Sequence, residues 1–220
     1  MPLTAIITVL RALGIWLFLA VVFIGLVLIG VGHGPWNYCW FFAMGCWLLL
    51  DTYWVVGTLT TKPIMLPRHY RRAVIVSFMV HAVYCLPLSS VPVLGQQILP
   101  HFIPLKILGA FMCATGVSFA MWARHILAGN WNAAVALQQR HVLIRAGPYA
   151  IVRHPIYFGF FLMALGMFLA LGEVRGLACL AHALQFFEKM KFEEDILRTT
   201  YPDEYPGYER RVKRLVPFVW

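Results

Sequence analysis

Acidic residues are scarce in this sequence, and charge of either sign is low. Only nine of the 220 residues are Asp or Glu and 12% are charged in total, whereas soluble domains carry about 25%. Hydrophobic residues make up 61% of the chain and the mean hydropathy is +0.74. The composition therefore excludes an ordinary soluble domain and indicates an integral membrane protein built of helices.

The sequence also lacks the usual signs of a metal centre or a disulfide framework. No His-Glu-x-x-His motif and no Cys-x-x-Cys pair occurs, and the cysteines all lie in apolar segments. We expect cysteines that pack in the core, and no bound metal. The five are Cys39, Cys46, Cys85, Cys113 and Cys179.

Long apolar stretches determine the expected fold. A helix of about 17 to 25 apolar residues crosses a bilayer core of about 30 Å. The first stretch is longer than the apolar part of a signal peptide and no small-residue cleavage site follows it, so we expect it to be retained. We predict an all-α integral membrane protein with five to six transmembrane helices. The predicted spans are residues 5–31, 36–59, 74–94, 105–128, 156–171 and 174–187.

The net charge of +9 is unevenly distributed. Basic residues collect in 60–73, in 124–154 and in the tail, whereas the other connections are nearly neutral. This alternation predicts a multi-pass protein with both termini in the cytoplasm, and it explains the positive charge without a nucleic-acid partner. Membrane lipids are the expected surroundings, and the sequence leaves the oligomeric state open.

The last two predicted spans are separated only by residues 172–176, which predicts a C-terminal helical hairpin. The final helix has no clear stop signal. We expect it to leave the membrane and to continue as an amphipathic segment over 188–200. Pro202 and Pro206 are expected to end it.

Two polar clusters lie beside these spans. A turn at Gly147-Pro148-Tyr149 leads into Arg153-His154-Pro155 at the start of a predicted span, and the hairpin returns Glu193-Glu194 to the same membrane face. Taken singly, the Arg-His-Pro motif is explained about as well as the basic flank of a helix, and the two acids as a solvated helix face. Together, carboxylates opposite Arg, His and aromatic rings form a cytoplasmic pocket. It suits a zwitterion with a second cationic centre, such as S-adenosylmethionine.

The order of these motifs, followed by Tyr205-x-x-Tyr208 and Leu215-x-Pro217, resembles the isoprenylcysteine carboxyl methyltransferase family and the related phospholipid methyltransferases. The resemblance runs from about Trp122 to the end of the chain. It implies a small membrane enzyme that uses S-adenosylmethionine as cofactor and methylates a lipidic or small hydrophobic acceptor. The implied cofactor contacts are His141, Val142, Leu143, Gly147, Tyr149, Arg153, His154, Pro155, Tyr157, Glu193 and Glu194.

We accordingly expect one membrane domain over residues 1–220. Residues 1–103 would hold the N-terminal spans, and residues 104–220 would form the catalytic, cofactor-binding half.

Four residues are candidates for catalysis or acceptor binding. By the same resemblance, Asn130 lies on the acceptor side and Arg214 precedes the final Leu-x-Pro. A carboxylate acceptor needs no base and would be held by cationic groups such as Arg214. An amine acceptor must first lose a proton, and Glu194 or His154 would then be the base.

The two adjacent acids should differ in burial. Glu194 lies seven and four residues after Phe187 and Met190, on the apolar face of the predicted helix. We therefore expect Glu194 in the buried part of the pocket and Glu193 nearer its rim, with side chains about 100° apart. One of them would hold the cofactor ammonium, and the other would face the acceptor or support Arg153 or His154.

Several alternatives stay open. Within methyl transfer, the acceptor is a carboxylate, a phospholipid or other amine, or a thiol. An NADPH-dependent reductase of the sterol-reductase type resembles this architecture, but its Arg-Cys and Trp elements are absent. A transporter or non-catalytic subunit fits poorly because the polar residues gather at one membrane face. Asp51, the only acid before Glu173, has either a function or a structural partner in its span.

Overall fold

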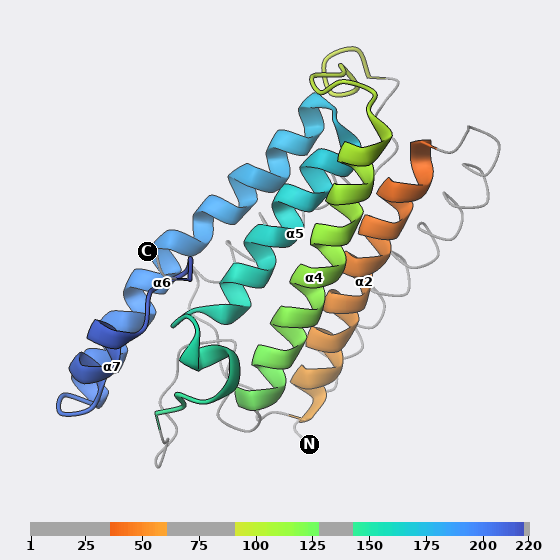
Figure 1. The fold of residues 1–220 in the computed structure, drawn as a ribbon. Helices are drawn as coiled ribbons and strands as arrows, with labels where there is room; N and C mark the ends of the chain where they lie inside the picture. Colours follow the sequence, from red (N-terminus) through yellow and green to blue (C-terminus); the bar gives the residue numbers. More distant parts are fainter. Residues whose placement is uncertain (1–35, 61–90, 128–142, 218–220) are drawn as a thin grey trace, which may run out of the picture.

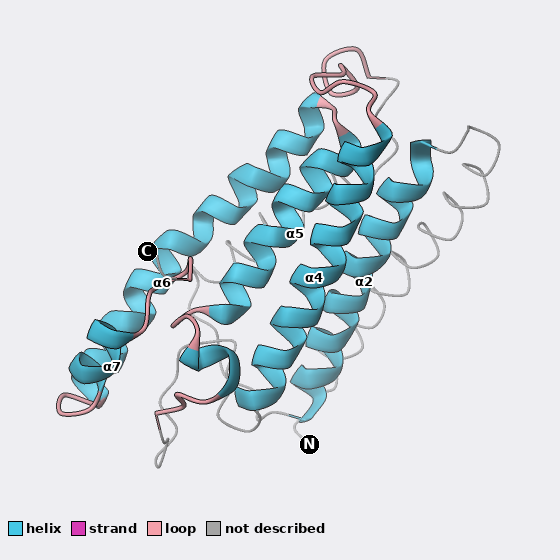
Figure 2. Cartoon of the chain, in the orientation of Figure 1, coloured by secondary structure: helices cyan, strands magenta, loops and turns pink. Residues whose placement is uncertain are grey.

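The computed structural model describes residues 36–60, 91–127 and 143–217, which form helices joined by loops and turns (Figure 1 and Figure 2). Within those ranges the only β-pairing is two isolated bridges. The long helices are α2 (Trp36–Thr60), α4 (Ile103–Leu127), α5 (Pro155–Leu171) and α6 (Leu177–Thr200). The short elements are α7 (Tyr205–Arg211) and two 3-10 turns, η3 (Gly147–Ala150) and η4 (Val174–Gly176).

The four long helices correspond to four of the six predicted spans. The span predicted at 5–31 lies outside the described residues, and so does most of the span at 74–94. Residues 91–94, its predicted end, lie in a turn instead of a helix. In the described part of the chain, α4 is the helix that is long and apolar enough to cross a membrane, and α5 is a shorter apolar helix.

Small residues bring α4 and α5 into close contact. Gly109 of α4 lies against Gly166 of α5, and Gly116 lies against Gly159, so the two helices are antiparallel. A methyl group added to Gly116 would come within 2.6 Å of the Gly159 carbonyl oxygen. Close backbone approach of this kind is typical of membrane helices, where van der Waals contact takes the place of the hydrophobic driving force.

The predicted hairpin joins α5 to α6. Gly172 ends α5 in the left-handed conformation, with φ of 70°, a geometry that favours glycine. The Nζ of Lys106 donates to the carbonyl oxygens of Ala170 and Leu171, both at 3.3 Å. Lys106 thus supplies a partner to carbonyls that have none inside the helix. It fixes this end of α5 to α4.

α6 is one continuous helix of 24 residues, as expected for a helix that extends beyond its apolar part. It ends at Thr200, just before Pro202. The expectation for Pro206 is wrong, because this residue lies in the first turn of α7. Proline is favoured there because the first N–H groups of a helix have no intrahelical partner.

An aromatic core joins α2, α5 and α6. The Phe160 ring lies 6.0 Å from Trp47 and 5.8 Å from Trp54 of α2, measured between centroids. Phe186 of α6 lies 5.0 Å from Phe160 and stacks on Tyr157 at 5.1 Å. This core extends along α5 to its first turn, where the polar residues begin.

The polar segments gather at the end of the bundle where α5 begins. Residues 143–154 and α7 lie there, whereas η4 and residues 91–102 lie at the opposite end (Figure 1). The chain after α7 returns toward the start of α5 and pairs with residues 152–154. The two ends of the bundle therefore differ in chemistry, and the predicted motifs all belong to one of them.

Candidate active site

The site is assembled by pairing between two segments that are far apart in the sequence. Val152 and Lys213 form a parallel bridge. The Arg153 N–H donates to the Lys213 carbonyl at 2.8 Å, and the His154 N–H donates to the Arg214 carbonyl at 3.0 Å. This backbone pairing carries the Arg214 side chain to the Arg-His-Pro motif.

Glu194 lies at the centre of this assembly, with a side chain that is 0% exposed. Its Oε1 accepts from Arg153 Nη2 at 2.8 Å and from Arg153 Nε at 3.0 Å. Arg214 donates from Nη2 to Oε2 at 2.6 Å, and His154 Nε2 lies 3.2 Å from Oε1. One buried carboxylate thus joins α6, the loop before α5 and the C-terminal segment.

These partners keep Glu194 ionised. Burial by itself acts to raise the pKa of this carboxyl group, but hydrogen bonds from His154, Arg214 and Arg153 outweigh burial and hold the pKa far below its usual range. The same contact raises the pKa of the Arg214 guanidinium. Glu194 is therefore a fixed negative charge at neutral pH.

The hydrogen bonds of Arg153 that the structure describes are all made to other residues of the protein. Besides Glu194, it donates from Nη1 to the carbonyl oxygens of Glu209 at 3.0 Å and Val212 at 2.7 Å. Its side chain is only 9% exposed. This guanidinium fixes the end of α7 to α6, and its contact with the cofactor stays a prediction.

A second group of ion pairs surrounds Glu194. Arg198 pairs with Glu209 at 2.6 Å, which joins α6 to α7 and lowers the pKa of Glu209. Arg145 pairs with Glu204 and so joins the loop before η3 to the start of α7. Tyr208 donates its hydroxyl proton to the Tyr149 carbonyl at 2.7 Å. The C-terminal segment therefore holds the predicted turn at two points, Arg145 and Tyr149.

Glu193 has a different environment. Its side chain is 23% exposed, and the Tyr157 hydroxyl donates to its Oε1 at 2.5 Å. The other oxygen lies 3.7 Å from His154 Nδ1. Glu194 is buried and Glu193 is at the rim, so the prediction made from helix spacing is confirmed.

The structure brings most of the predicted cofactor residues to this end of the bundle. Gly147 has φ of 61° in η3 and lies beside Trp122 of α4. Tyr149 is buried, and burial raises the pKa of its hydroxyl. Pro155 is the buried first residue of α5, and Leu143 lies just before η3, half-buried. Asn130, His141 and Val142 lie outside the described residues.

The sequence did not reveal the supporting residues. In the sequence, Arg198 and Glu209 are only charged residues of the tail. Tyr208 is part of the family resemblance, which assigns it no role. The spacing Tyr205-x-x-Tyr208 was the one available signal. The roles of these residues depend on how α7 folds back, which no local pattern encodes.

Two other observations bear on chemistry. In the described ranges no group of three His, Cys, Asp or Glu side chains could hold a metal ion.

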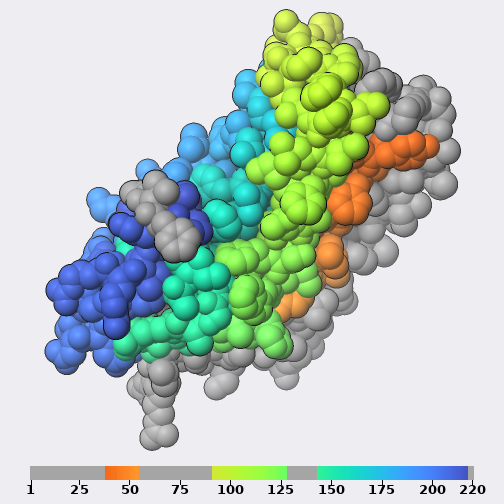
Figure 3. Space-filling view, viewed as in Figure 1, coloured from red at the N-terminus to blue at the C-terminus, as the bar shows by residue number. Residues whose placement is uncertain are grey.

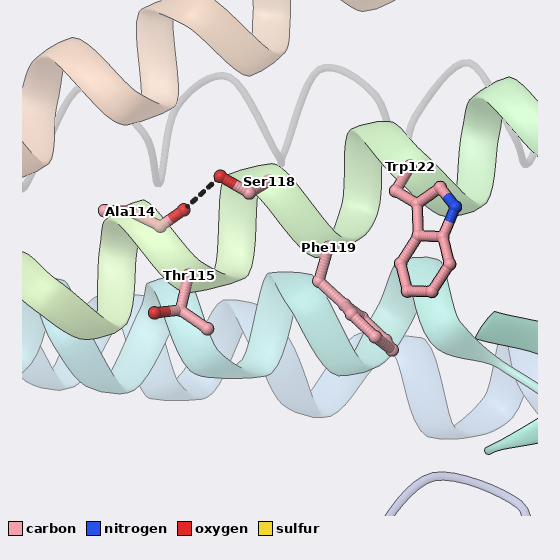
Figure 4. Close-up of a pocket in the computed structure, with 5 residues that line it drawn as sticks. All are labelled: Ala114, Thr115, Ser118, Phe119 and Trp122. Carbon is pink, nitrogen blue, oxygen red and sulfur yellow. Dashed lines mark hydrogen bonds between the residues drawn. The ribbon is translucent and has the colours of Figure 1, made fainter. Parts of the chain in front are cut away.

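A hollow of about 590 Å³ lies on the outer face of α4, lined by Ala114, Thr115, Ser118, Phe119 and Trp122 (Figure 4). Its two hydroxyls donate to carbonyls of their own helix. It therefore offers apolar contact and no titratable group.

Comparison with known proteins gives matches to one family of membrane methyltransferases. Residues 108–199 match the model of the isoprenylcysteine carboxyl methyltransferase (ICMT) family. The Schizosaccharomyces pombe protein-S-isoprenylcysteine O-methyltransferase is 34% identical over 110 residues, which are 49% of this chain and 42% of that relative. Protein-S-isoprenylcysteine O-methyltransferase B of Arabidopsis thaliana is 27% identical over 165 residues, which are 73% of this chain and 79% of that relative.

The fold also matches a solved structure. That of the eukaryotic intramembrane Ras methyltransferase ICMT has a TM-score of 0.61, with 21% identity over 100% of this chain and 87% of that chain. The alignment with the Schizosaccharomyces pombe relative spans less than half of that relative's length. Residues 108–199 of this chain therefore match the isoprenylcysteine carboxyl methyltransferase family, and the resemblance seen in the sequence is confirmed.

Proposed function

We propose that the protein is an S-adenosylmethionine-dependent membrane methyltransferase that acts on a lipidic carboxylate of the S-prenylcysteine type. The observation that carries this proposal is the unequal pair at the end of α6. Glu194 is neutralised by Arg153 and Arg214, whereas the Glu193 carboxylate is partly exposed and lies beside the Tyr157 and His154 side chains. An exposed carboxylate beside aromatic faces suits a cationic small molecule.

The residues present fit S-adenosylmethionine. Glu193 is the partner for the cofactor ammonium. The buried Tyr157 ring stacks on Phe186 and has the Lys189 ammonium 5.6 Å from its centroid, so the aromatic side of the site already accommodates a cation. The first N–H groups of α5 are donors suited to the cofactor carboxylate. When bound, the cofactor supplies an electrophilic methyl group.

Within this proposal the Arg153–Glu194 pair positions the site and does not contact the cofactor. The pair fixes His154 and Arg214 from either side, because Glu194 accepts from both. His141, Val142, Leu143, Gly147 and Tyr149 would form the rest of the cofactor wall, as the resemblance implies. Asn130 would lie on the acceptor side. Residues 104–220 would thus form the catalytic half.

The charge state of the site favours an acceptor that needs no base. Glu194 has a pKa far below its usual range, so it takes no proton at neutral pH. An amine acceptor would have to lose a proton before attack, whereas a carboxylate is already nucleophilic. Arg214 is 28% exposed beyond its bonds to Glu194 and could hold such a carboxylate. The residues would then contribute mainly alignment, worth up to about 7–11 kcal/mol in well-oriented systems.

A binding and turnover experiment tests the proposal. Calorimetric titration of the purified protein should detect S-adenosylmethionine, with affinity unchanged by a chelator and with no binding of NADPH. Transfer of labelled methyl groups is then measured with an S-farnesylcysteine carboxylate, a phosphatidylethanolamine and an apolar thiol. The carboxylate should be the preferred acceptor. Binding of NADPH alone would exclude methyl transfer, and preference for the amine would move the reaction to N-methylation.

We also propose an integral membrane protein with both termini in the cytoplasm, because basic residues cluster at the site end of the bundle. His101 and Lys213 lie at opposite ends. Single cysteines at these positions, in a chain whose own cysteines are replaced, report the topology through a membrane-impermeant thiol reagent. Position 213 should react from the cytoplasmic side, and position 101 from the other side. The reverse pattern would invert the topology.

A further inference from the structure

We propose that a hollow beside the candidate active site binds the anionic phosphate head group of a membrane phospholipid. The hollow has a volume of about 350 Å³ and is lined by Ala150, Ile151, Arg211 and Lys213. Small-molecule sites commonly start at about 300 Å³. Two basic side chains and an apolar floor are the chemistry that a phosphodiester joined to hydrocarbon requires.

The charge in this hollow is not neutralised by the acids of the tail. Glu209 pairs with Arg198, and Glu204 pairs with Arg145. Among the described residues no ion pair includes Arg211 or Lys213, although both are exposed. Arg211 donates from Nε to the carbonyl oxygen of Gly207 in its own helix. This bond does not use the Nη1 and Nη2 groups. The hollow therefore carries uncompensated positive charge.

The hollow lies near the ends of the apolar helices α4 and α5, where we expect the head groups of a bilayer. Ile151 precedes the first residue of α5 by four positions, and its side chain is 41% exposed. Trp122, near the end of α4, is 45% exposed and lies beside η3. Exposed tryptophan at the end of an apolar helix is typical of the membrane interface. This position favours a lipid over a soluble phosphate or an acidic protein.

The hollow is also joined to the candidate site. Figure 3 shows the segments around residues 150 and 213 side by side on one face, and the Val152–Lys213 bridge connects them. The residue after Lys213 is Arg214, which bonds Glu194. A lipid phosphate held by Lys213 and Arg211 would keep this segment against the loop before α5, so the ligand would stabilise the folded site.

Thermal unfolding of the full-length protein in a neutral detergent tests the proposal. Short-chain phosphatidylserine is titrated, with short-chain phosphatidylcholine, inorganic phosphate and polyglutamate in separate series. Phosphatidylserine should raise the unfolding temperature saturably, and the other three should raise it little. Equal stabilisation by phosphatidylcholine, which has a phosphodiester but no net charge, would refute recognition of an anionic head group. Stabilisation by phosphate alone, or by polyglutamate alone, would replace the lipid with a free anion or an acidic partner.

Substitutions locate the site. Lys213→Gln keeps the backbone bridge and removes one charge, and Arg211→Gln removes the other. Each should weaken phosphatidylserine binding by roughly fivefold, because one basic residue near an anionic lipid surface contributes about 1 kcal/mol. The control is Lys191→Gln, an exposed residue on α6 outside the hollow. Equal weakening by all three changes would refute a specific site and leave only general charge attraction.

Discussion

Replacing each acid of the Glu193-Glu194 pair by glutamine should separate stability from cofactor binding. Glu194→Gln removes the carboxylate that pairs with the half-buried Arg214 and Arg153, and it leaves Arg153 only its longer contact with Glu209 at 3.6 Å. Breaking a buried ion pair costs about 3–5 kcal/mol, and glutamine keeps some hydrogen bonding, so we expect a loss near the lower limit. At about 2–4 °C per kcal/mol for a chain of this size, the unfolding temperature should fall by roughly 6–12 °C.

Glu193→Gln should leave stability nearly unchanged and weaken cofactor binding. This carboxylate is at the rim and accepts a single described hydrogen bond, from Tyr157. A typical hydrogen bond contributes about 0.5–1.5 kcal/mol, and the amide oxygen can still accept it. Stability should therefore change little. Loss of a charge-assisted bond to the cofactor ammonium, worth about 1.5–3 kcal/mol, should weaken S-adenosylmethionine binding by about ten- to a hundredfold.

The assay combines thermal unfolding in detergent with calorimetric titration at a temperature where both variants are folded. Asp195→Asn is the matched control, because this neighbouring acid is 57% exposed and pairs only on the helix surface, with Arg198. It should alter neither quantity appreciably. If Glu193→Gln and Glu194→Gln lowered stability equally, Glu194 would not be the structural residue of the pair, and the separate role of Glu193 in cofactor binding would be refuted.

The pH dependence of stability gives a further check on Glu194. Its pKa in the folded protein is lower than the 4.5 of the free group, so its stabilising contribution is complete above that value. The contribution is lost as pH falls below about 4.5 and proton uptake favours the unfolded chain. Wild-type stability should thus fall steeply with acidification, and Glu194→Gln should flatten this slope. An unchanged slope would mean that another group controls acid unfolding.

Two substitution pairs test the packing and the turn. Gly116→Ala should destabilise by about 1–3 kcal/mol, the usual cost of overpacking, because its methyl would meet the α5 backbone; Gly45→Ala on α2 meets nothing within 4 Å and should be tolerated in the same unfolding assay. Tyr208→Phe removes the donor to a buried carbonyl, at about 1–3 kcal/mol, and should raise the KM for the cofactor more than it lowers kcat. The Tyr205 hydroxyl is buried with no partner among the described residues, so Tyr205→Phe should be neutral or stabilising, and equal effects of the two tyrosines would refute the role given to Tyr208.

Local patterns predicted the parts of the fold that depend on neighbouring residues. The length of apolar stretches located α2, α4, α5 and α6, because a helix satisfies its own backbone and must match the bilayer thickness. Spacing by four and seven residues predicted that Glu194 would be buried and that Glu193 would lie at the rim. Both predictions use only the periodicity of one helix.

The sequence alone therefore determined the four long helices among the described residues and the end of the bundle that carries the polar motifs. The tertiary structure decided what those motifs contact. Arg153 bonds Glu194 of α6 and a carbonyl at the end of α7. Arg214 reaches Glu194 because the chain after α7 returns to pair with residues 152–154. A local pattern cannot encode that return, since it depends on backbone bonds between segments about sixty residues apart.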